Sequence, residues 1–221
     1  MDLFFWDTGN DRPKWRQLRL AMNKRFAVKV PIRYGRKSAS REGTYTMVLS
    51  PFCDHGGAIV VECRKSISSS TDLITEAICL WEVEGGVKNS VSGTWGSVGI
   101  LVNPSSNVDK EIVHGWTGFV CGQKNYGNFP HHPQEGAIVS NVGVLNLRWP
   151  NLSSGGQLAL DLLLAPVTAP SLEGTPPNYP SVLTIAEAWK SNPSEDYYFW
   201  NNRRNGITTY QDAMIEQVLR E

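Results

Sequence analysis

The sequence predicts an α+β fold, a mostly antiparallel, partly closed β-barrel with a few helices. Most apolar segments are short and rich in β-branched or aromatic residues, as in TYTMVLS at 44–50 and TWGSVGILV at 94–102. Only a few segments carry the apolar spacing of an amphipathic helix. The 221 residues, of which 41% are hydrophobic, fit a single domain spanning 1–221.

The N-terminal half is expected to alternate between strands and helices. In order, the patterns predict a strand at 3–10 ending in a Gly-Asn turn, a helix at 15–26, strands at 44–50 and 57–65, and a helix at 68–84. The last helix has clear ends, because hydroxyl residues and Asp72 suit its N-cap, while Gly85 and Gly86 suit its stop.

The C-terminal half is expected to hold further strands followed by helices. The patterns predict strands at 94–102, 111–120 and 138–147, a segment at 158–165 that suits either helix or strand, a Pro-rich connector at 168–180, and helices at 181–189 and 208–220. The aromatic run Tyr197–Trp200 suits either a strand that closes a barrel end or a protein interface, and we favour both over nucleic-acid stacking.

The composition narrows the choice of partners. Lys plus Arg and Asp plus Glu each total 21, so the net charge favours neither nucleic acid nor a membrane. No apolar run approaches the roughly 18 residues of a membrane span, and the N-terminus does not read as a signal peptide. The four cysteines show no paired spacing, which is typical of reduced thiols. We therefore expect a cytoplasmic protein, and its oligomeric state is not indicated.

Glu84 is the carboxylate that the pattern singles out. Counted from Leu73 at about 100° per residue, Glu84 lies roughly 20° away, on the apolar face, whereas Glu82 lies about 180° away and should face water. Glu76 falls near the edge of the apolar face. A carboxylate on a buried face at a helix C-terminus is disfavoured in its charged form, which is one way to build a general acid or base. The alternative is that the helix frays and Glu84 turns to solvent.

Several segments resemble the γ-glutamylcyclotransferase superfamily. They are LWEVEGGVK, SGTWGSVGILV and KEIVHGWTGFV in the middle of the chain, and PPNYPSVLTIAEAW followed by NGITTYQ near its end. The resemblance covers mostly residues 44–120 and 176–211. It implies that region 121–175 is an inserted loop set.

The resemblance implies an enzyme that needs no metal or organic cofactor. In the implied reaction, the α-amine of a γ-glutamyl group attacks its own side-chain carbonyl, and 5-oxoproline or a related lactam forms as an amine leaves. The glutamate before the glycine serves as acid and base in that family, and this position is Glu84 here. The implied substrate is a small molecule.

The resemblance also places a substrate-binding turn after the first strand, at Thr8, Gly9 and Asn10. The family's Tyr-Gly-Ser at this turn is replaced by other residues, which favours a second hypothesis, a non-catalytic module that binds a small anionic ligand or a protein partner. In the segment RYGRKSASREGTY, Arg36 and Arg41 are candidates for binding an anionic group, and the alternative is a solvated basic loop.

A third option is a metal-dependent hydrolase. Cys53 and His55 lie in one segment, and His131 and His132 in another, and such residues are zinc ligands. Their spacing matches no standard zinc signature, so loop positions with no metal are the simpler interpretation.

Overall fold

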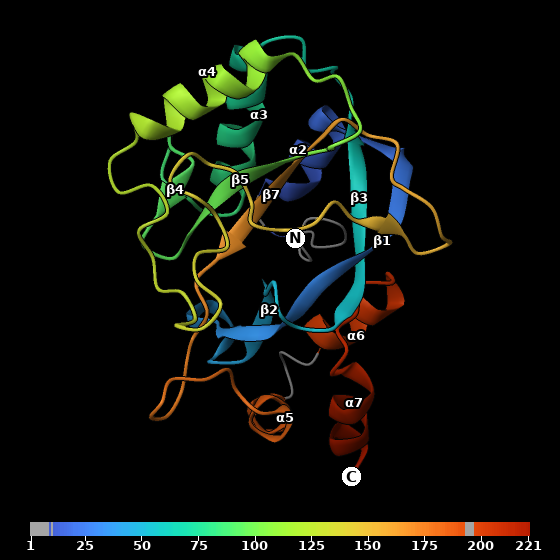
Figure 1. The fold of residues 1–221 in the computed structure, drawn as a ribbon. Helices are drawn as coiled ribbons and strands as arrows, with labels where there is room; N and C mark the ends of the chain where they lie inside the picture. The colour runs from blue at the N-terminus through green and yellow to red at the C-terminus, as the bar shows by residue number, and fades with distance from the viewer. Residues whose placement is uncertain (1–8, 10, 193–196) are drawn as a thin grey trace.

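The computed structural model describes residue 9, residues 11–192 and residues 197–221. It contains two antiparallel sheets with helices packed outside them (Figure 1). The first sheet consists of β1 (Leu20–Lys37), β2 (Tyr45–Leu49), β3 (His55–Cys63) and the short β6 (Asn151–Leu152). The second consists of β4 (Ser92–Gly93), β5 (Gly96–Val102) and β7 (Leu162–Thr168).

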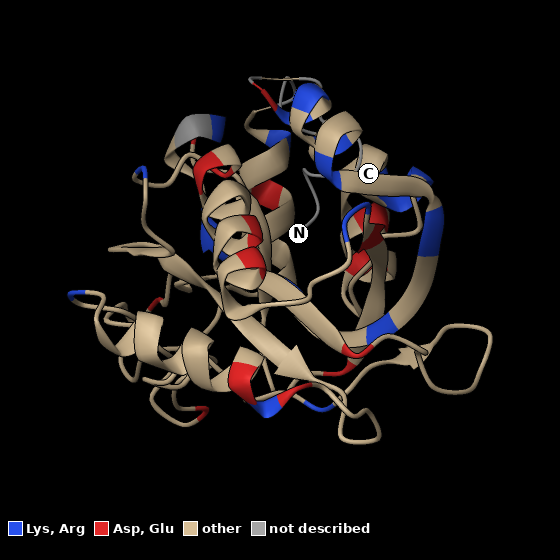
Figure 2. Cartoon of the chain, turned by 90° about the horizontal axis from the view of Figure 1, so that it is seen from above, with Lys and Arg blue, Asp and Glu red and all other residues tan. Residues whose placement is uncertain are grey.

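The helices fall into groups at different parts of the molecule. They are α2 (Arg12–Arg19), α3 (Ser70–Val83), α4 (Lys110–Cys121), α5 (Val182–Lys190), α6 (Tyr197–Arg204) and α7 (Asp212–Arg220), with a 3₁₀ turn at Ala39–Arg41. Figure 1 shows α3 and α4 beside the β5–β7 sheet, with α5, α6 and α7 at the opposite end. No described helix is both long and apolar enough to cross a bilayer. Figure 2 shows acidic and basic positions interspersed along the ribbon.

Strand β1 belongs to two packing environments. Its first part pairs with β3, from Leu20 opposite Cys63 to Pro31 opposite His55. Its last part pairs with β2, from Ile32 opposite Leu49 to Lys37 opposite Tyr45. One long strand therefore borders β3 along one stretch and β2 along the next.

The C-terminal helices cover one face of the β1–β2 pair. The buried residues of this cluster alternate along both strands, as one face of a pleated sheet requires, and meet aromatic residues of the helices. The cluster includes Ile32, Tyr34, Tyr45, Met47, Ile185, Trp189, Tyr198, Phe199 and Ile215. On the other side, α3 and α4 bury Leu73, Trp81 and Trp116 against β5.

The predicted α+β class with antiparallel sheets is confirmed. Within the described residues, no strand pairing joins the two sheets, so they do not close into a barrel. Region 121–175 contains β6, β7 and long irregular stretches, and β7 pairs with β5 along its whole length.

Several predicted elements are confirmed and others are wrong. Strands predicted at 44–50, 57–65 and 94–102 match β2, β3 and β5, and helices predicted at 68–84, 181–189 and 208–220 match α3, α5 and the shorter α7. The strand predicted at 3–10 lies almost wholly outside the described residues. The helix predicted at 15–26 instead ends at Arg19, where β1 begins.

The other differences lie in the second half of the chain. The strand predicted at 111–120 is helix α4, and the strand predicted at 138–147 is irregular chain with isolated bridges such as Ile100 to Val144. The ambiguous segment at 158–165 leads into strand β7. The aromatic run at 197–200 belongs to helix α6, whose Tyr198 and Phe199 are buried in the core.

Candidate functional site

A cavity of about 660 Å³ lies between the two sheets and α3. Its walls are mainly aliphatic side chains from β3, β7 and the buried face of α3. The polar residues that line it are mostly exposed and mark the rim where it meets solvent: Lys65, Ser66, Ser68, Asn107, Asp109, Arg148 and Asp161. A site with an apolar interior and a polar rim suits a small molecule that is largely apolar.

The two strands that wall the cavity have an unusual sequence for antiparallel strands. An antiparallel strand with one face in water normally alternates apolar and polar residues. The segments 58–61 and 162–167 are instead continuously apolar. Residues 59–61 and 162–164 are only half-buried, and all of them line the cavity. Because successive side chains of a strand point to opposite faces, part of the surface that they retain faces this space, while Ile59 also packs against the C-terminal helix cluster.

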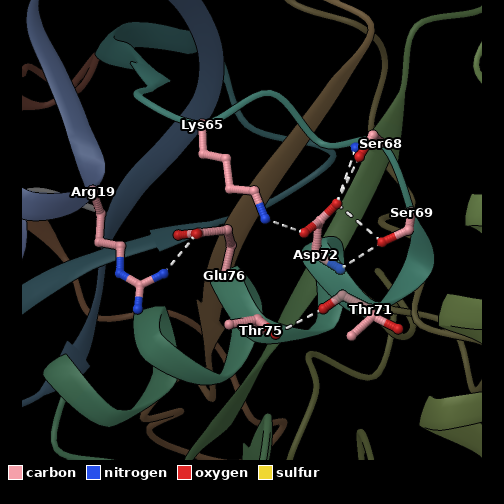
Figure 3. A network of polar contacts seen from close by, with 8 residues as sticks. All are labelled: Arg19, Lys65, Ser68, Ser69, Thr71, Asp72, Thr75 and Glu76. Carbon is pink, nitrogen blue, oxygen red and sulfur yellow. Dashed lines mark hydrogen bonds and ion pairs between the residues drawn. The ribbon is translucent and has the colours of Figure 1, made fainter.

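The N-terminus of α3 holds part of the rim in place. The Ser69 hydroxyl accepts a hydrogen bond from the Asp72 backbone N–H at 3.1 Å and caps the helix. The Asp72 carboxylate accepts hydrogen bonds from Lys65 and from Ser68, as Figure 3 shows. These contacts, led by that with Lys65, hold the pKa of Asp72 below its usual range. The rim segment 65–68 is thus tied to the helix.

Glu76 places a carboxylate on the cavity wall. The residue is buried, and its Oε1 accepts a hydrogen bond from Nη1 of Arg19 at 2.8 Å (Figure 3). This hydrogen bond raises the pKa of Arg19. Cys63 of β3 lines the same cavity, and burial, with the nearby charges of Glu76 and Glu62, raises the pKa of its thiol to about 11. The helical count had put Glu76 only at the edge of the apolar face, so this position was missed as a site residue.

Glu84 lies at the end of α3 and is largely buried, as the helical count predicted. Only 14% of its side chain is exposed, and its Oε2 lies 3.7 Å from Nη2 of Arg12. It is not among the residues that line the cavity. Glu82 was predicted to face water, but it is half-buried, because its side chain turns back to accept a hydrogen bond from the backbone N–H of Asn89. The catalytic role of Glu84 stays a prediction.

The two arginines predicted to bind an anion point toward different parts of the fold. Arg36 is in β1, and its Nη1 donates to the carbonyl oxygens of Trp95 and Ala169 at 3.3 and 3.4 Å. Burial lowers the pKa of Arg36. Arg41 is buried in the 3₁₀ turn, with its guanidinium 4.2 Å from the ring centre of Tyr198. Both residues contact the core, and their role in binding an anion stays a prediction.

The predicted binding turn is only partly described. Gly9 is exposed in a bend, while Thr8 and Asn10 lie outside the described residues. The binding role of this turn therefore stays a prediction.

The cysteine and histidine residues weighed as zinc ligands have other neighbours. His131 packs against Phe129, and His132 stacks on Tyr179 with ring centres 5.0 Å apart. The Tyr179 hydroxyl donates to Glu135 at 2.8 Å. No group of three or more His, Cys, Asp or Glu residues positioned to hold a metal ion occurs in the part of the chain that the structure describes.

Comparison with known proteins identifies no relative of this chain. No family model matches the chain, and no significant match occurs among curated proteins or solved structures.

Proposed function

We propose that this protein binds a small, largely apolar molecule in the cavity between its two sheets. The observation that carries the proposal is the cavity itself, whose 660 Å³ is within the range of ligand sites and whose walls are aliphatic. This is the binding-module hypothesis of the sequence analysis, with an apolar ligand body in place of a simple anion.

The cavity meets solvent at its rim, so it is not a sealed void of the kind that a core substitution leaves. Solvent that enters it lies against aliphatic walls, and an apolar molecule that displaces this water gains free energy because apolar surface is removed from water.

A fluorescent apolar probe tests this function. We expect N-phenyl-1-naphthylamine to bind with a saturable rise in fluorescence. Leu164→Trp on β7 and Val60→Trp on β3 fill the cavity from its two sides and should each abolish the signal. Leu183→Trp adds the same ring at an exposed position of α5 and should leave binding intact. Circular dichroism checks that each variant folds. The proposal would be overturned if the unmodified protein showed no saturable binding, or if both filled variants bound the probe as tightly as the unmodified protein does.

A γ-glutamylcyclotransferase activity on a barrel-like fold is the second candidate. The observation that favours it is the low exposure of the Glu84 carboxylate at the end of α3, beside Arg12. In this candidate Glu84 moves the protons of the cyclisation, and the expected product is 5-oxoproline.

Glu84→Gln tests the second candidate, because it keeps the shape and removes the proton acceptor. Mass spectrometry should detect 5-oxoproline from γ-glutamyl compounds, with release lowered by about 10²-fold or more in the variant. Glu82→Gln, on the same helix, should change release less than a few-fold. Thermal melting of both variants separates lost chemistry from the lost contact with Arg12. Equal losses in the two variants would contradict a catalytic Glu84.

A further inference from the structure

The buried carboxylate of Glu76 distinguishes one point of the apolar cavity wall. Its residue is 7% exposed and is one of the cavity-lining residues, whereas its partner Arg19 is not. Arg19 engages Oε1 from the side, at 2.8 Å. Figure 3 shows the two side chains approaching each other from α3 and from the junction of α2 with β1.

The second carboxylate oxygen is left for a ligand. No described residue donates a hydrogen bond to Glu76 Oε2. The fully enclosed polar side-chain atoms that lack a partner do not include it, so Oε2 retains contact with open space. An ionised carboxylate only accepts hydrogen bonds, so whatever occupies this point must donate one.

We propose that Glu76 selects ligands that carry a hydroxyl group on an apolar body. This inference rests on the binding function proposed above and names the ligand class of that same cavity. The apolar part of the ligand packs on the strands, and its hydroxyl donates to Oε2.

Charge decides between a hydroxyl and the alternatives. A ligand carboxylate offers no proton to Oε2 and meets a like charge, so it is disfavoured. A ligand ammonium could donate, but Arg19 already neutralises Glu76, so the ammonium would lose its hydration for little net attraction. A neutral hydroxyl gives up less hydration and still gains a charge-assisted hydrogen bond.

Nearby charges do not change this choice. Lys65 is paired with Asp72, and Glu62 is paired with Lys24 at 2.8 Å. The other charged residues of the lining, Asp109, Arg148 and Asp161, are exposed to solvent at the rim. Among the described lining residues, Glu76 therefore carries the buried charge, which is paired with Arg19.

Three ligands with the same chain and different head groups test the inference. 1-Decanol, decanoate and decylamine each compete for bound N-phenyl-1-naphthylamine. We expect decanol to compete at least about tenfold more tightly than decanoate, the scale of one hydrogen bond to a charged group. Glu76→Gln should reduce the preference for decanol over decanoate about tenfold. The variant removes the negative charge that repels decanoate, and it leaves the Arg19 guanidinium without its carboxylate partner. Glu82→Gln, on the same helix but outside the cavity lining, should keep the wild-type order.

A second variant guards against poor folding of Glu76→Gln. Arg19→Gln changes a partly exposed side chain and leaves the Glu76 charge unneutralised, so the preference should move toward decylamine. The head-group inference would be overturned if the three ligands competed equally, or if Glu76→Gln and Arg19→Gln both kept the wild-type order of affinities. Saturable probe binding would in that case still support the cavity function. Absence of probe binding would instead overturn the cavity function.

Discussion

At the scale of single residues, the four thiols should differ in reactivity. Cys121 is exposed, whereas burial raises the pKa of Cys53 and of Cys63 to about 11. The thiolate is the reactive form, so both of these half-buried thiols should react slowly with iodoacetamide near neutral pH. Their rates should then rise about tenfold per pH unit until the pH approaches the pKa. Peptide mass spectrometry after timed labelling measures each site.

Cys63 also reports on the cavity, because it lines the space that Cys53 does not. Saturating decanol should slow the labelling of Cys63 and leave that of Cys53 unchanged, although both thiols have a similarly raised pKa. Labelling of Cys63 at the rate of Cys121 near pH 7.5 would contradict the raised pKa of the Cys63 thiol.

The spacing of residues along α3 predicted which way a side chain points but not which residue it pairs with. The helical count from Leu73 predicted that Glu84 turns inward, and its side chain is 14% exposed. The same count placed Glu76 at the edge of the apolar face. The helical count could not predict the pairing of Glu76 with Arg19, because Arg19 lies 57 residues away in the sequence and is brought close only by folding. Spacing along a helix defines a direction, whereas an ion pair depends on what the rest of the chain brings there.

At the scale of elements, close pairing of β5 with β7 depends on Gly96. A Cβ added there would lie 2.2 Å from the Val167 carbonyl oxygen, which belongs to the neighbouring strand and cannot move aside. We expect Gly96→Ala to lower the free energy of unfolding by about 1–3 kcal/mol, the scale of overpacking.

Gly118 provides the matched control for this substitution. It is an exposed position of α4 with no atom within 4 Å of the added Cβ. Gly118→Ala should therefore raise stability by about 0.5–1 kcal/mol through the smaller entropy of the unfolded chain. Urea unfolding of both variants measures the difference, and a stability loss for Gly118→Ala equal to that for Gly96→Ala would refute the steric argument.

Helices with a clear cap and stop signal were predicted well, whereas segments assigned only from their content of β-branched and aromatic residues were not. Helix α3 has its Ser69 cap and glycines after its end, and its predicted and observed bounds nearly agree. In α4 the β-branched and aromatic residues suggested a strand, yet the buried residues Ile112, Trp116 and Val120 recur every four positions, which is a helical period. The helix predicted at 15–26 failed because residues 20–26 continue into a strand that pairs with β3, and a local pattern contains no information about that partner.

At the scale of the whole molecule, ligand binding should stabilise both walls of the cavity together. A ligand that binds only the folded state at about 100 times its Kd adds about 2.7 kcal/mol of stability, so decanol should raise Tm. Hydrogen exchange should slow in residues 58–63 and 160–166 and remain unchanged in α7, which does not line the cavity. Slower exchange across all segments alike would indicate that decanol binds outside the cavity.

The cavity could not be predicted from the sequence, because the segments that form its walls lie far apart in the chain. The segment that forms β3 was predicted as a strand, whereas the segment at 158–165, which leads into β7, was left open between helix and strand. Nothing in either segment shows that the strands face one another across an open space rather than pack together. That separation follows from the placement of α3 and of the two sheets, which only the folded chain defines.

The double role of β1 limits how this protein can be shortened. Its last residues, with those of β2, carry Ile32, Tyr34 and Met47 on the face that the C-terminal helices cover. An engineered fragment that stops after residue 180 would retain every strand around the cavity but expose that apolar face to solvent. Such a fragment should self-associate, because contiguous apolar surface promotes aggregation. Reporter fusions or truncations made to study binding should therefore keep helices α5 to α7 attached.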